Sequence, residues 1–339
     1  MVFAPIVKQP RRKKMLRNKT IAKTSLAALL FGAVCVVVFL LAKPQTQTDQ
    51  LKIVSTIFPG YDFARTIAGD NADITMLIYP GSEIHSFEPS PQDIINIQDS
   101  DVFIYVGGES EAWVEKIIAN LDTNRTKIVR MMDAVDLVEE ELVEGMESEH
   151  KHEHEDEDER ESEVEYDEHV WTSPLNAIKI VESIRDALVN ADPQNANYYQ
   201  TATANYTEQL AQLDSDIRAT LSDTAHHTLI FGDRFPLRYF VEEYNLQYYA
   251  AFPGCSDQTE ASTATLTFLI NKIKSENIKY IFTIELSNQA VARTIATETG
   301  AEILEFHSLH NISKSDFDSG KTYLQIMHQN LTNLKRALN

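Results

Sequence analysis

The distribution of apolar and polar residues along the chain predicts strands and helices that follow one another in turn. Short β-branched runs such as 52–57 and 101–106 are stopped by glycine or proline, which is typical of strands. Stretches with apolar residues at helical spacing, such as 61–67, lie between them. We predict strands at 52–57, 73–78, 101–106, 228–231, 247–251, 280–284 and 302–306, and helices at 61–67, 94–97, 237–244, 264–275, 289–299 and 315–338. Because strand and helix alternate, we expect parallel α/β sheets.

Two amphipathic segments interrupt this alternation near the middle of the chain. We predict one helix over 175–188 and a second, longer helix that ends near Leu221. These connecting helices, 175–221, separate two α/β lobes at 51–174 and 227–339. Ligands of open α/β sheets bind at the carboxyl ends of the strands. We therefore expect the binding site in the cleft between the two lobes.

A basic segment and then an apolar segment precede the first strand. Residues 1–24 are rich in lysine and arginine, 25–42 are uncharged and apolar, and 43–50 are polar. The apolar stretch is close to the roughly 20 residues that span a bilayer, and no convincing small-residue cleavage site follows it. We expect an uncleaved membrane anchor with a cytoplasmic basic end, followed by a short tether and an extracytoplasmic body. The alternative is an unusually long cleaved signal, which would leave a secreted protein.

The charge of the chain excludes some partners. The formal net charge is −21, which argues against nucleic acid because no basic stripe follows the N-terminal segment. Much of the acidic excess lies at 139–168, a tract that also carries His150, His152 and His154. Such a tract cannot bury enough apolar surface to fold, so we predict a disordered loop that holds divalent cations weakly. The alternative is a solvated loop without a role. The two cysteines provide no disulfide framework.

Residue types that bind metals stand at the ends of several predicted strands. His85 follows the turn after the second strand, Asp233 closes the strand at 228–231, and His307 closes the strand at 302–306. The full set of candidates is His85, His169, Asp233, Glu285 and His307. One such residue alone is more often a capping or surface residue than a ligand. Imidazoles and carboxylates from both lobes, without a thiolate, suit Zn²⁺ or Mn²⁺ and exclude a cysteine-type structural site.

Two motifs in a fixed order point to a known family. The first runs from Gly81 to Pro91 and reads GSEIHSFEPSP, and the second, DEHVWTSP, contains His169 and follows the acidic tract. The long connecting helix and the C-terminal residues Glu260, Ser287 to Gln289 and Thr299 to Ala301 extend the likeness to about 50–335. Together they resemble the zinc/manganese solute-binding components of bacterial ABC importers, the ZnuA/TroA type. The resemblance implies that His85 and His169 are metal ligands from the first lobe.

The second lobe departs from the pattern of this family. The family usually has His or Glu directly after a strand, where this chain reads FGDRFPLRY, and of the residues at that place only Asp233 can coordinate a metal. The family's fourth donor is commonly an Asp after a late strand, and the matching residue is His307. The resemblance therefore implies a site of His85, His169, His307 and Asp233. Glu285 is the alternative to Asp233, and His310 is the alternative to His307. We expect His307→Ala to weaken zinc binding and His310→Ala to change it little.

The resemblance implies a monomeric binding protein that captures a divalent metal and delivers it to an ABC permease driven by a separate ATPase. No Gly-x-x-x-x-Gly-Lys-Ser/Thr loop is present in the sequence, so this chain does not hydrolyse ATP itself. Three imidazoles and one carboxylate favour Zn²⁺ over Mn²⁺, and a manganese-binding member of the same family is the alternative.

Two other classes of protein are alternatives to a binding protein. A zinc hydrolase needs three ligands, an open position and a general base, such as Glu285 or Glu260. The sequence has no His-Glu-x-x-His signature, and the candidate ligands are spread over the whole chain, so we expect no enzyme. A surface adhesin that keeps the same fold is the other alternative.

Overall fold

The computed structural model describes residue 1 and residues 50–82, 87–146, 165–224, 226–254, 256 and 260–339. The predictions for the basic segment, the apolar anchor, most of the tether and the middle of the acidic tract lie outside these residues, as does His85. The chain divides into two units, 1–49 and 50–339, and the helices and strands of the described residues belong to the second. Among the described helices, none has both the length and the apolar composition that a membrane crossing requires.

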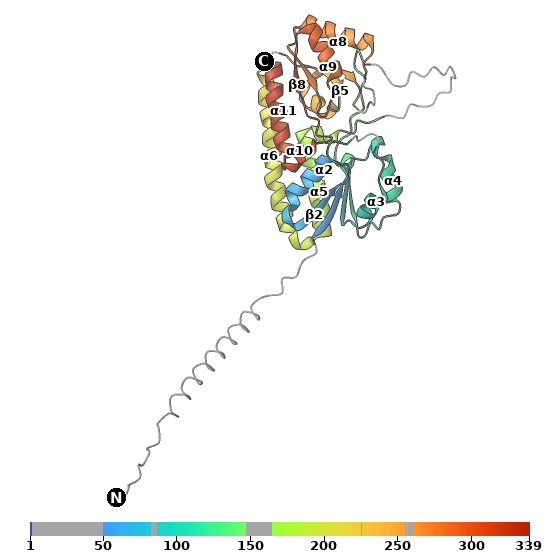
Figure 1. Cartoon of the computed structure of the whole chain (residues 1–339), viewed down its shortest axis with the longest axis vertical. Coiled ribbons are helices and arrows are strands. Elements are labelled where there is room, and N and C mark those ends of the chain that lie inside the picture. Colours follow the sequence, from blue (N-terminus) through green and yellow to red (C-terminus); the bar gives the residue numbers. More distant parts are fainter. Residues whose placement is uncertain (2–49, 83–86, 147–164, 225, 255, 257–259) are drawn as a thin grey trace, which may run out of the picture. The chain divides into compact units, whose positions relative to one another are not determined.

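Two four-stranded sheets form the framework of residues 50–339 (Figure 1). The first sheet contains β1 (Leu51–Ser55), β2 (Ala72–Met76), β3 (Val102–Tyr105) and β4 (Lys127–Arg130), in the order β2-β1-β3-β4. The second contains β5 (Thr228–Arg234), β6 (Gln247–Phe252), β7 (Tyr280–Thr283) and β8 (Glu302–Glu305), in the order β6-β5-β7-β8. All paired strands are parallel. The predicted pair of parallel α/β lobes is confirmed, and both lobes have the same strand order.

The helices of the first lobe follow its strands. They are α2 (Phe58–Ala68), α3 (Pro91–Gln98), α4 (Ala112–Ile118) and α5 (Pro174–Ala191). Gly69 ends α2 with a φ of 54°, a conformation that glycine adopts without strain. The side chains of Ser90 and Asp93 form a capping box that starts α3. The sequence pattern did not predict α4 or β4, because seven and four residues respectively are too few to display a clear period.

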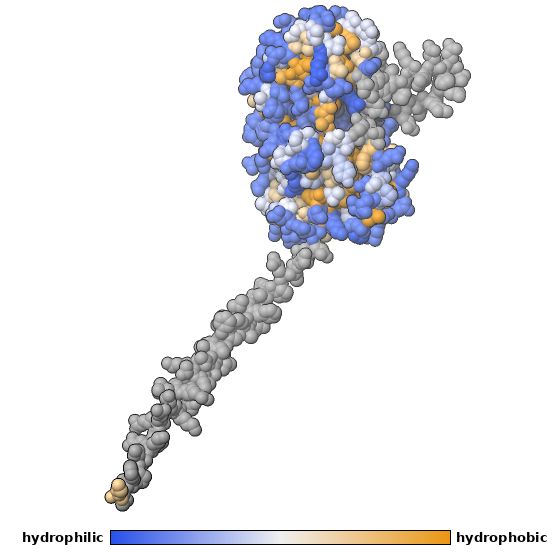
Figure 2. Space-filling model, viewed as in Figure 1, coloured by the Kyte–Doolittle hydropathy of each residue, from blue (hydrophilic) through white to orange (hydrophobic). Residues whose placement is uncertain are grey.

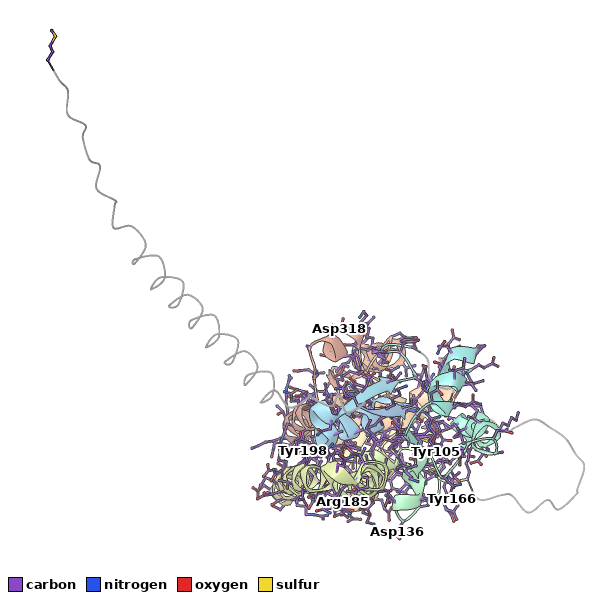
Figure 3. All side chains as sticks on the ribbon, turned by 90° about the horizontal axis from the view of Figure 1, so that it is seen from below. Tyr105, Asp136, Tyr166, Arg185, Tyr198 and Asp318 are labelled. Carbon is purple, nitrogen blue, oxygen red and sulfur yellow. The ribbon has the colours of Figure 1, made fainter. Side chains whose placement is uncertain are left out.

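A long helix, α6 (Ala196–Ser222), joins the two lobes. It has 27 residues and buries one stripe of side chains, namely Tyr199, Thr203, Tyr206, Leu210, Leu213, Ile217 and Leu221. Tyr198, next to this stripe, is 48% exposed and lies at the periphery of the molecule (Figure 3). The buried stripe packs against α5, α2 and the last helix, α11 (Tyr323–Leu338). The predicted connecting helix is therefore confirmed.

The second lobe contains α7 (Arg238–Tyr244), α8 (Thr263–Glu276), α9 (Ala290–Thr299) and α10 (Lys314–Asp318). Where the sequence predicted one terminal helix over 315–338, the structure has two, α10 and α11. Gly320 breaks the helix with a φ of 74°, and a capping box of Thr322 and Gln325 starts α11. The backbone N–H of Tyr323 donates to Asp62 of α2 over 2.8 Å, which ties the last helix to the first lobe.

Apolar side chains cover both faces of each sheet. The neighbouring residues Ile53 and Val54 of β1 belong to different clusters, as do Ile230 and Phe231 of β5. Such two-sided burial is characteristic of parallel sheets flanked by helices. The largest cluster contains residues of both sheets and of α6, so one apolar core runs through the junction of the lobes. Hydrophilic residues cover most of the visible surface (Figure 2).

The two ends of the acidic tract are paired with each other. Glu139 and Tyr166 form an antiparallel bridge, and the N–H of Glu140 donates to the carbonyl oxygen of Glu165 over 2.9 Å. Tyr166 is partly exposed at the rim of the first lobe (Figure 3). The prediction of a disordered loop over 139–168 is thus corrected at 139–146 and 165–168, because backbone pairing closes the loop there. The central residues 147–164 lie outside the described residues.

Candidate metal centre

His169 lies at the end of the segment that leaves the acidic tract, and its side chain is completely buried. Its backbone N–H donates to Oδ1 of Asp167 over 2.8 Å, and its Nδ1 lies 3.2 Å from the same oxygen. A carboxylate at Nδ1 holds the ring proton there and leaves the lone pair of Nε2 available for a metal. Nε2 is buried and has no hydrogen-bond partner among the described residues. A buried nitrogen without a partner is costly unless a ligand satisfies it.

Carboxylates surround His169. Burial lowers the pKa of His169, but Asp167, Glu168 and Glu140 raise it, and the net result is a pKa above the usual value. Burial, together with Glu165 and Asp167, raises the pKa of Glu140 to about 7. The potential at His169 is therefore negative, which favours the approach of a cation.

Trp171 connects this segment to the second lobe. The indole is completely buried, and its Nε1–H donates to the carbonyl oxygen of Ser308 over 2.8 Å. The hydroxyl of Tyr323 donates to the carbonyl oxygen of Trp171 over 2.8 Å. Because Trp171 is two residues after His169, these contacts place His169 at the junction of the lobes.

The residue of the second lobe whose ring meets His169 is His310. The centroids of the two imidazoles are 4.9 Å apart and their planes are nearly perpendicular, at 89°. The ring of His310 is also 5.2 Å from that of Trp171. His310 belongs to the loop 307–312 that follows β8, so the structure brings together one histidine from each lobe.

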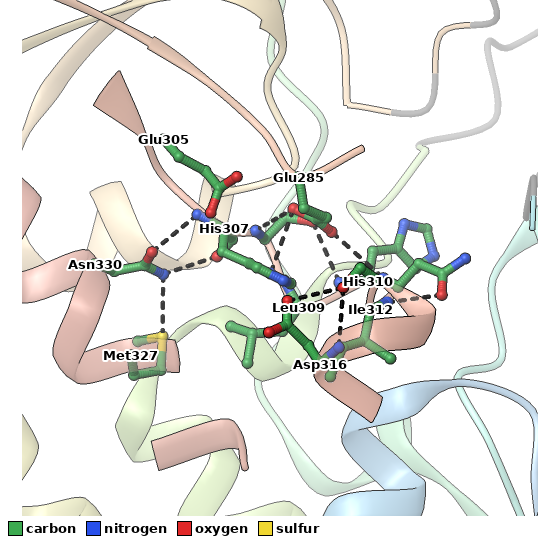
Figure 4. Close-up of polar contacts among 12 residues, drawn as sticks. Glu285, Glu305, His307, Leu309, His310, Ile312, Asp316, Met327 and Asn330 are labelled. Atoms are coloured by element: carbon green, nitrogen blue, oxygen red, sulfur yellow. Dashed lines mark hydrogen bonds and ion pairs between the residues drawn. The ribbon is translucent and has the colours of Figure 1, made fainter. Parts of the chain in front are cut away.

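His307 occupies a different environment at the start of the same loop (Figure 4). Its backbone N–H donates to Oδ1 of Asn330 over 2.9 Å, and its carbonyl oxygen accepts from Nδ2 of Asn330 over 2.7 Å. Its Nδ1 accepts from the backbone N–H of Leu309 over 3.0 Å and lies 3.5 Å from Oε2 of Glu285. The backbone and Nδ1 of His307 are therefore engaged by Leu309, Glu285 and Asn330, and its role as a ligand stays a prediction.

Glu285, which follows β7, is hydrogen-bonded to this loop. Its Oε2 accepts the backbone N–H of Ser308 over 2.6 Å, and its Oε1 accepts the hydroxyl of Ser308 over 2.6 Å. Oε1 also accepts the backbone N–H of Asn311 over 3.4 Å. The carboxylate of Glu285 already accepts three hydrogen bonds from the loop. These bonds fix the shape of the loop that carries His310 (Figure 4).

Asp233 closes β5 and lines a cavity of about 270 Å³, together with Ser82, Glu285 and His310. Its Oδ1 accepts the backbone N–H of Arg234 over 2.9 Å. Its Oδ2 is buried and has no hydrogen-bond partner among the described residues, and burial raises its pKa. An unsatisfied carboxylate oxygen in a polar cavity is a suitable donor to a cation.

The described residues do not complete a coordination sphere. Within them, no group of three or more His, Cys, Asp or Glu side chains stands close enough to hold one ion. His85 lies in the segment 83–86, which is outside the described residues. The chain that leads to it is nearby, because Nδ2 of Asn311 donates to the carbonyl oxygen of Ser82 over 2.5 Å. The described part of the site is therefore the pair His169 and His310, with Asp233 on the wall of the adjoining cavity.

Comparison with known proteins gives a family match over most of the chain. The family described as "ZnuA: Zinc-uptake complex component A periplasmic" matches residues 53–337. The chain is 33% identical over 311 residues to the zinc-binding lipoprotein AdcA of Streptococcus pneumoniae (strain ATCC BAA-255 / R6). The aligned residues cover 91% of this chain and 60% of that relative. It is 37% identical over 290 residues to the high-affinity zinc uptake system protein ZnuA of Bacillus subtilis (strain 168), covering 86% of this chain and 88% of that protein.

A solved structure supports the same relation. The crystal structure of the Zn(II)-bound ZnuA-like domain of Streptococcus pneumoniae AdcA is similar with a TM-score of 0.69 at 31% sequence identity. The match covers 85% of this chain and 99% of that chain. The present chain thus spans the whole of that domain but only 60% of the length of the full-length pneumococcal relative.

Proposed function

Because the chain belongs to the ZnuA family of periplasmic zinc-uptake complex components, we propose that it captures Zn²⁺ outside the cytoplasmic membrane and delivers the ion to an ABC importer. The partners are then a permease and its ATPase. The observation that carries the proposal is the pair of imidazoles at the junction of the lobes. His169 keeps a buried Nε2 without a described partner, and the ring of His310 lies 4.9 Å from its ring.

The ligand set that we propose combines this pair with two further residues. His85 follows Ser82 by three residues in the sequence and is the third imidazole. Asp233, with its unsatisfied Oδ2 on the wall of the adjoining cavity, is the carboxylate. His307 remains the alternative to His310, and its buried contacts with Leu309 and Asn330 support a role in shaping the loop instead.

Zinc is the cargo that this donor set favours. Imidazole nitrogens bind Zn²⁺ more tightly than Mn²⁺ in the general affinity order. The two relatives are named for zinc binding and zinc uptake, which favours a binding protein over a hydrolase and zinc over manganese. Each imidazole must be neutral to coordinate, so the protein releases protons as it binds zinc when the pH is low.

The extracytoplasmic location has support from the comparisons. The family is described as periplasmic, and the pneumococcal relative is named a lipoprotein. We propose further that residues 25–42 hold the chain at the membrane and that the binding unit, residues 50–339, acts as a monomer. Fractionation of cells that produce the full chain tests the first point, since a cleaved signal would release the protein from the membrane.

Elemental analysis and a competition titration of the purified chain test the cargo. We expect one tightly bound zinc ion for each chain and weaker binding of manganese. Tighter binding of manganese would contradict zinc as the cargo. Turnover of peptide or ester substrates by the zinc-loaded protein would contradict a function restricted to binding.

A further inference from the structure

Two hydrogen-bonded contacts between the lobes flank His310 in the sequence. On one side, the indole of Trp171 donates to the carbonyl oxygen of Ser308 over 2.8 Å. On the other side, the side chain of Asn311 is bonded to the backbone of Gly81 and Ser82 in the first lobe. The loop 307–312 is therefore held to the first lobe two residues before and one residue after His310, the residue that it presents to His169.

The amide of Asn311 uses both of its ends. Its Oδ1 accepts the backbone N–H of Gly81 over 3.3 Å and that of Ile312 over 2.7 Å. Its Nδ2 donates to the carbonyl oxygen of Ser82 over 2.5 Å. A carboxylamide has a donor and an acceptor side by side, and a two-point contact with a peptide backbone needs both. The residue is 5% exposed, so water does not readily replace these bonds.

The position of this contact relates it to the metal centre. Ser82, Ser308, His310 and Asn311 all line the cavity of about 270 Å³ that Asp233 also lines. The first lobe contributes Ser82 to this lining, and the second lobe contributes the other three residues. Separation of the lobes at this cavity must break the bonds of Asn311, and it also separates His310 from His169.

We propose that Asn311 is a clasp between the lobes, a positioning residue that holds the two halves of the metal centre together and slows the dissociation of zinc. The kinetic part rests on the proposed function. The clasp itself exists without metal, because its partners are backbone groups of the described residues. The inference predicts that loss of the amide increases the dissociation rate of zinc about tenfold, the size expected for the loss of a buried hydrogen-bonded pair.

Asn330 provides a matched control. It is also a buried asparagine, 3% exposed, and it also makes a two-point contact with a backbone, but both of these backbone partners are on His307. Its Nδ2 also donates to Sδ of Met327 over 3.7 Å, within the same helix. Asn311→Ala and Asn330→Ala therefore remove the same kind of contact from the same loop. Only the first variant removes a bond to the first lobe.

Two measurements on the full chain test the clasp. Zinc dissociation into an excess of a chromogenic chelator gives the release rate, which should rise about tenfold in Asn311→Ala and stay within twofold of wild type in Asn330→Ala. Hydrogen exchange of the Gly81 amide in the metal-free protein reports the clasp directly, since this N–H donates to Asn311. Its protection should be lost in Asn311→Ala and kept in Asn330→Ala.

Equal zinc dissociation rates in the two variants, with Gly81 still protected in Asn311→Ala, would overturn the clasp. If wild type binds no zinc, the proposed function fails, while the exchange of Gly81 still decides whether the clasp exists. If Asn311→Ala does not fold, Asn311→Ser carries the same expectations, because a serine hydroxyl can still accept the Ile312 N–H but is too short to bridge Gly81 and Ser82.

Discussion

The two lobes have the same strand order, yet they use the buried carboxylate that follows the third strand of each sheet differently. In the first lobe, Glu111 accepts the backbone N–H groups of Val106 and Gly107, directly after β3. In the second lobe, Glu285 follows β7 and accepts donors from Ser308 and Asn311, after the neighbouring strand β8. Glu111 thus accepts hydrogen bonds at the end of the strand that it follows, whereas Glu285 accepts hydrogen bonds from the loop that carries His310. A shared topology therefore fixes where a site lies, whereas local hydrogen bonds determine which side chain enters it.

The largest expected effect tests the role of the loop in the second lobe. His310→Ala should weaken zinc binding by at least about a hundredfold, because it removes one of a few imidazole ligands whose combined binding free energy is large. His307→Ala should mainly lower the melting temperature, since this side chain accepts the Leu309 N–H inside the loop. Competition titrations of both variants, with His169→Ala as the reference for a lost ligand, measure the difference.

If His307→Ala weakens zinc binding more than His310→Ala does, His307 is the ligand, as expected from the sequence. Wild-type affinity in both variants would show that neither histidine contributes, and would leave Asp233 as the candidate donor of the second lobe.

The same comparison shows how far the sequence could predict the site. His307 and His310 are three residues apart after one strand, and nothing in their spacing decides which ring faces the other lobe. The decision comes from Leu309, which has a φ of 63°, and from the bonds of the loop to Glu285. These are tertiary contacts with residues more than 20 positions away, and a hydrophobic period carries no information about them.

The fold was easier to predict than the site because most of its signals are local. Strands that end at glycine or proline and helices with a clear apolar stripe, such as α6, were found close to their observed bounds. The failures also have local causes. The four residues of β4 include two charged ones, Lys127 and Arg130, and the break at Gly320 interrupts an otherwise continuous helical pattern.

The next largest effect concerns the stability of the first lobe. Burial raises the pKa of Glu111 from 4.5 to about 7, so the native state binds a proton more tightly than the unfolded chain does. The stabilisation from this proton is complete below about pH 4.5 and is lost as the pH rises to about 7, with an upper limit of about 3 kcal/mol. Denaturant unfolding at several pH values, compared with Glu111→Gln, should show this loss in wild type only. The same slope in the variant would assign it to another group.

A smaller effect is expected at the carboxylate that supports His169. Asp167→Asn keeps the size of the side chain but removes the charge 3.2 Å from Nδ1 of His169. Loss of such a supporting carboxylate typically lowers metal affinity about tenfold to a hundredfold. Zinc titration should show this decrease, and Asp136→Asn, at an exposed position of the same lobe (Figure 3), should leave the affinity unchanged. Equal affinity in Asp167→Asn and wild type would remove Asp167 from the site.

The acidic tract is present in the first lobe and absent from the second. Deletion within this tract is expected to have the smallest effect on the affinity of the tight zinc site. Deletion of residues 150–163 should leave one tight zinc site and remove only weak additional binding, since an acidic sequence with so little apolar content is expected to lose conformational entropy when it holds an ion. The ends of the tract are already joined by the bridge of Glu139 with Tyr166 and by the bond from Glu140 to Glu165. We therefore expect a shorter connection between these paired ends to leave Asp167 and His169 in place. Titration of the deletion variant with zinc measures both classes of site, and loss of the tight one would mean that the tract supplies a ligand that the junction of the lobes lacks.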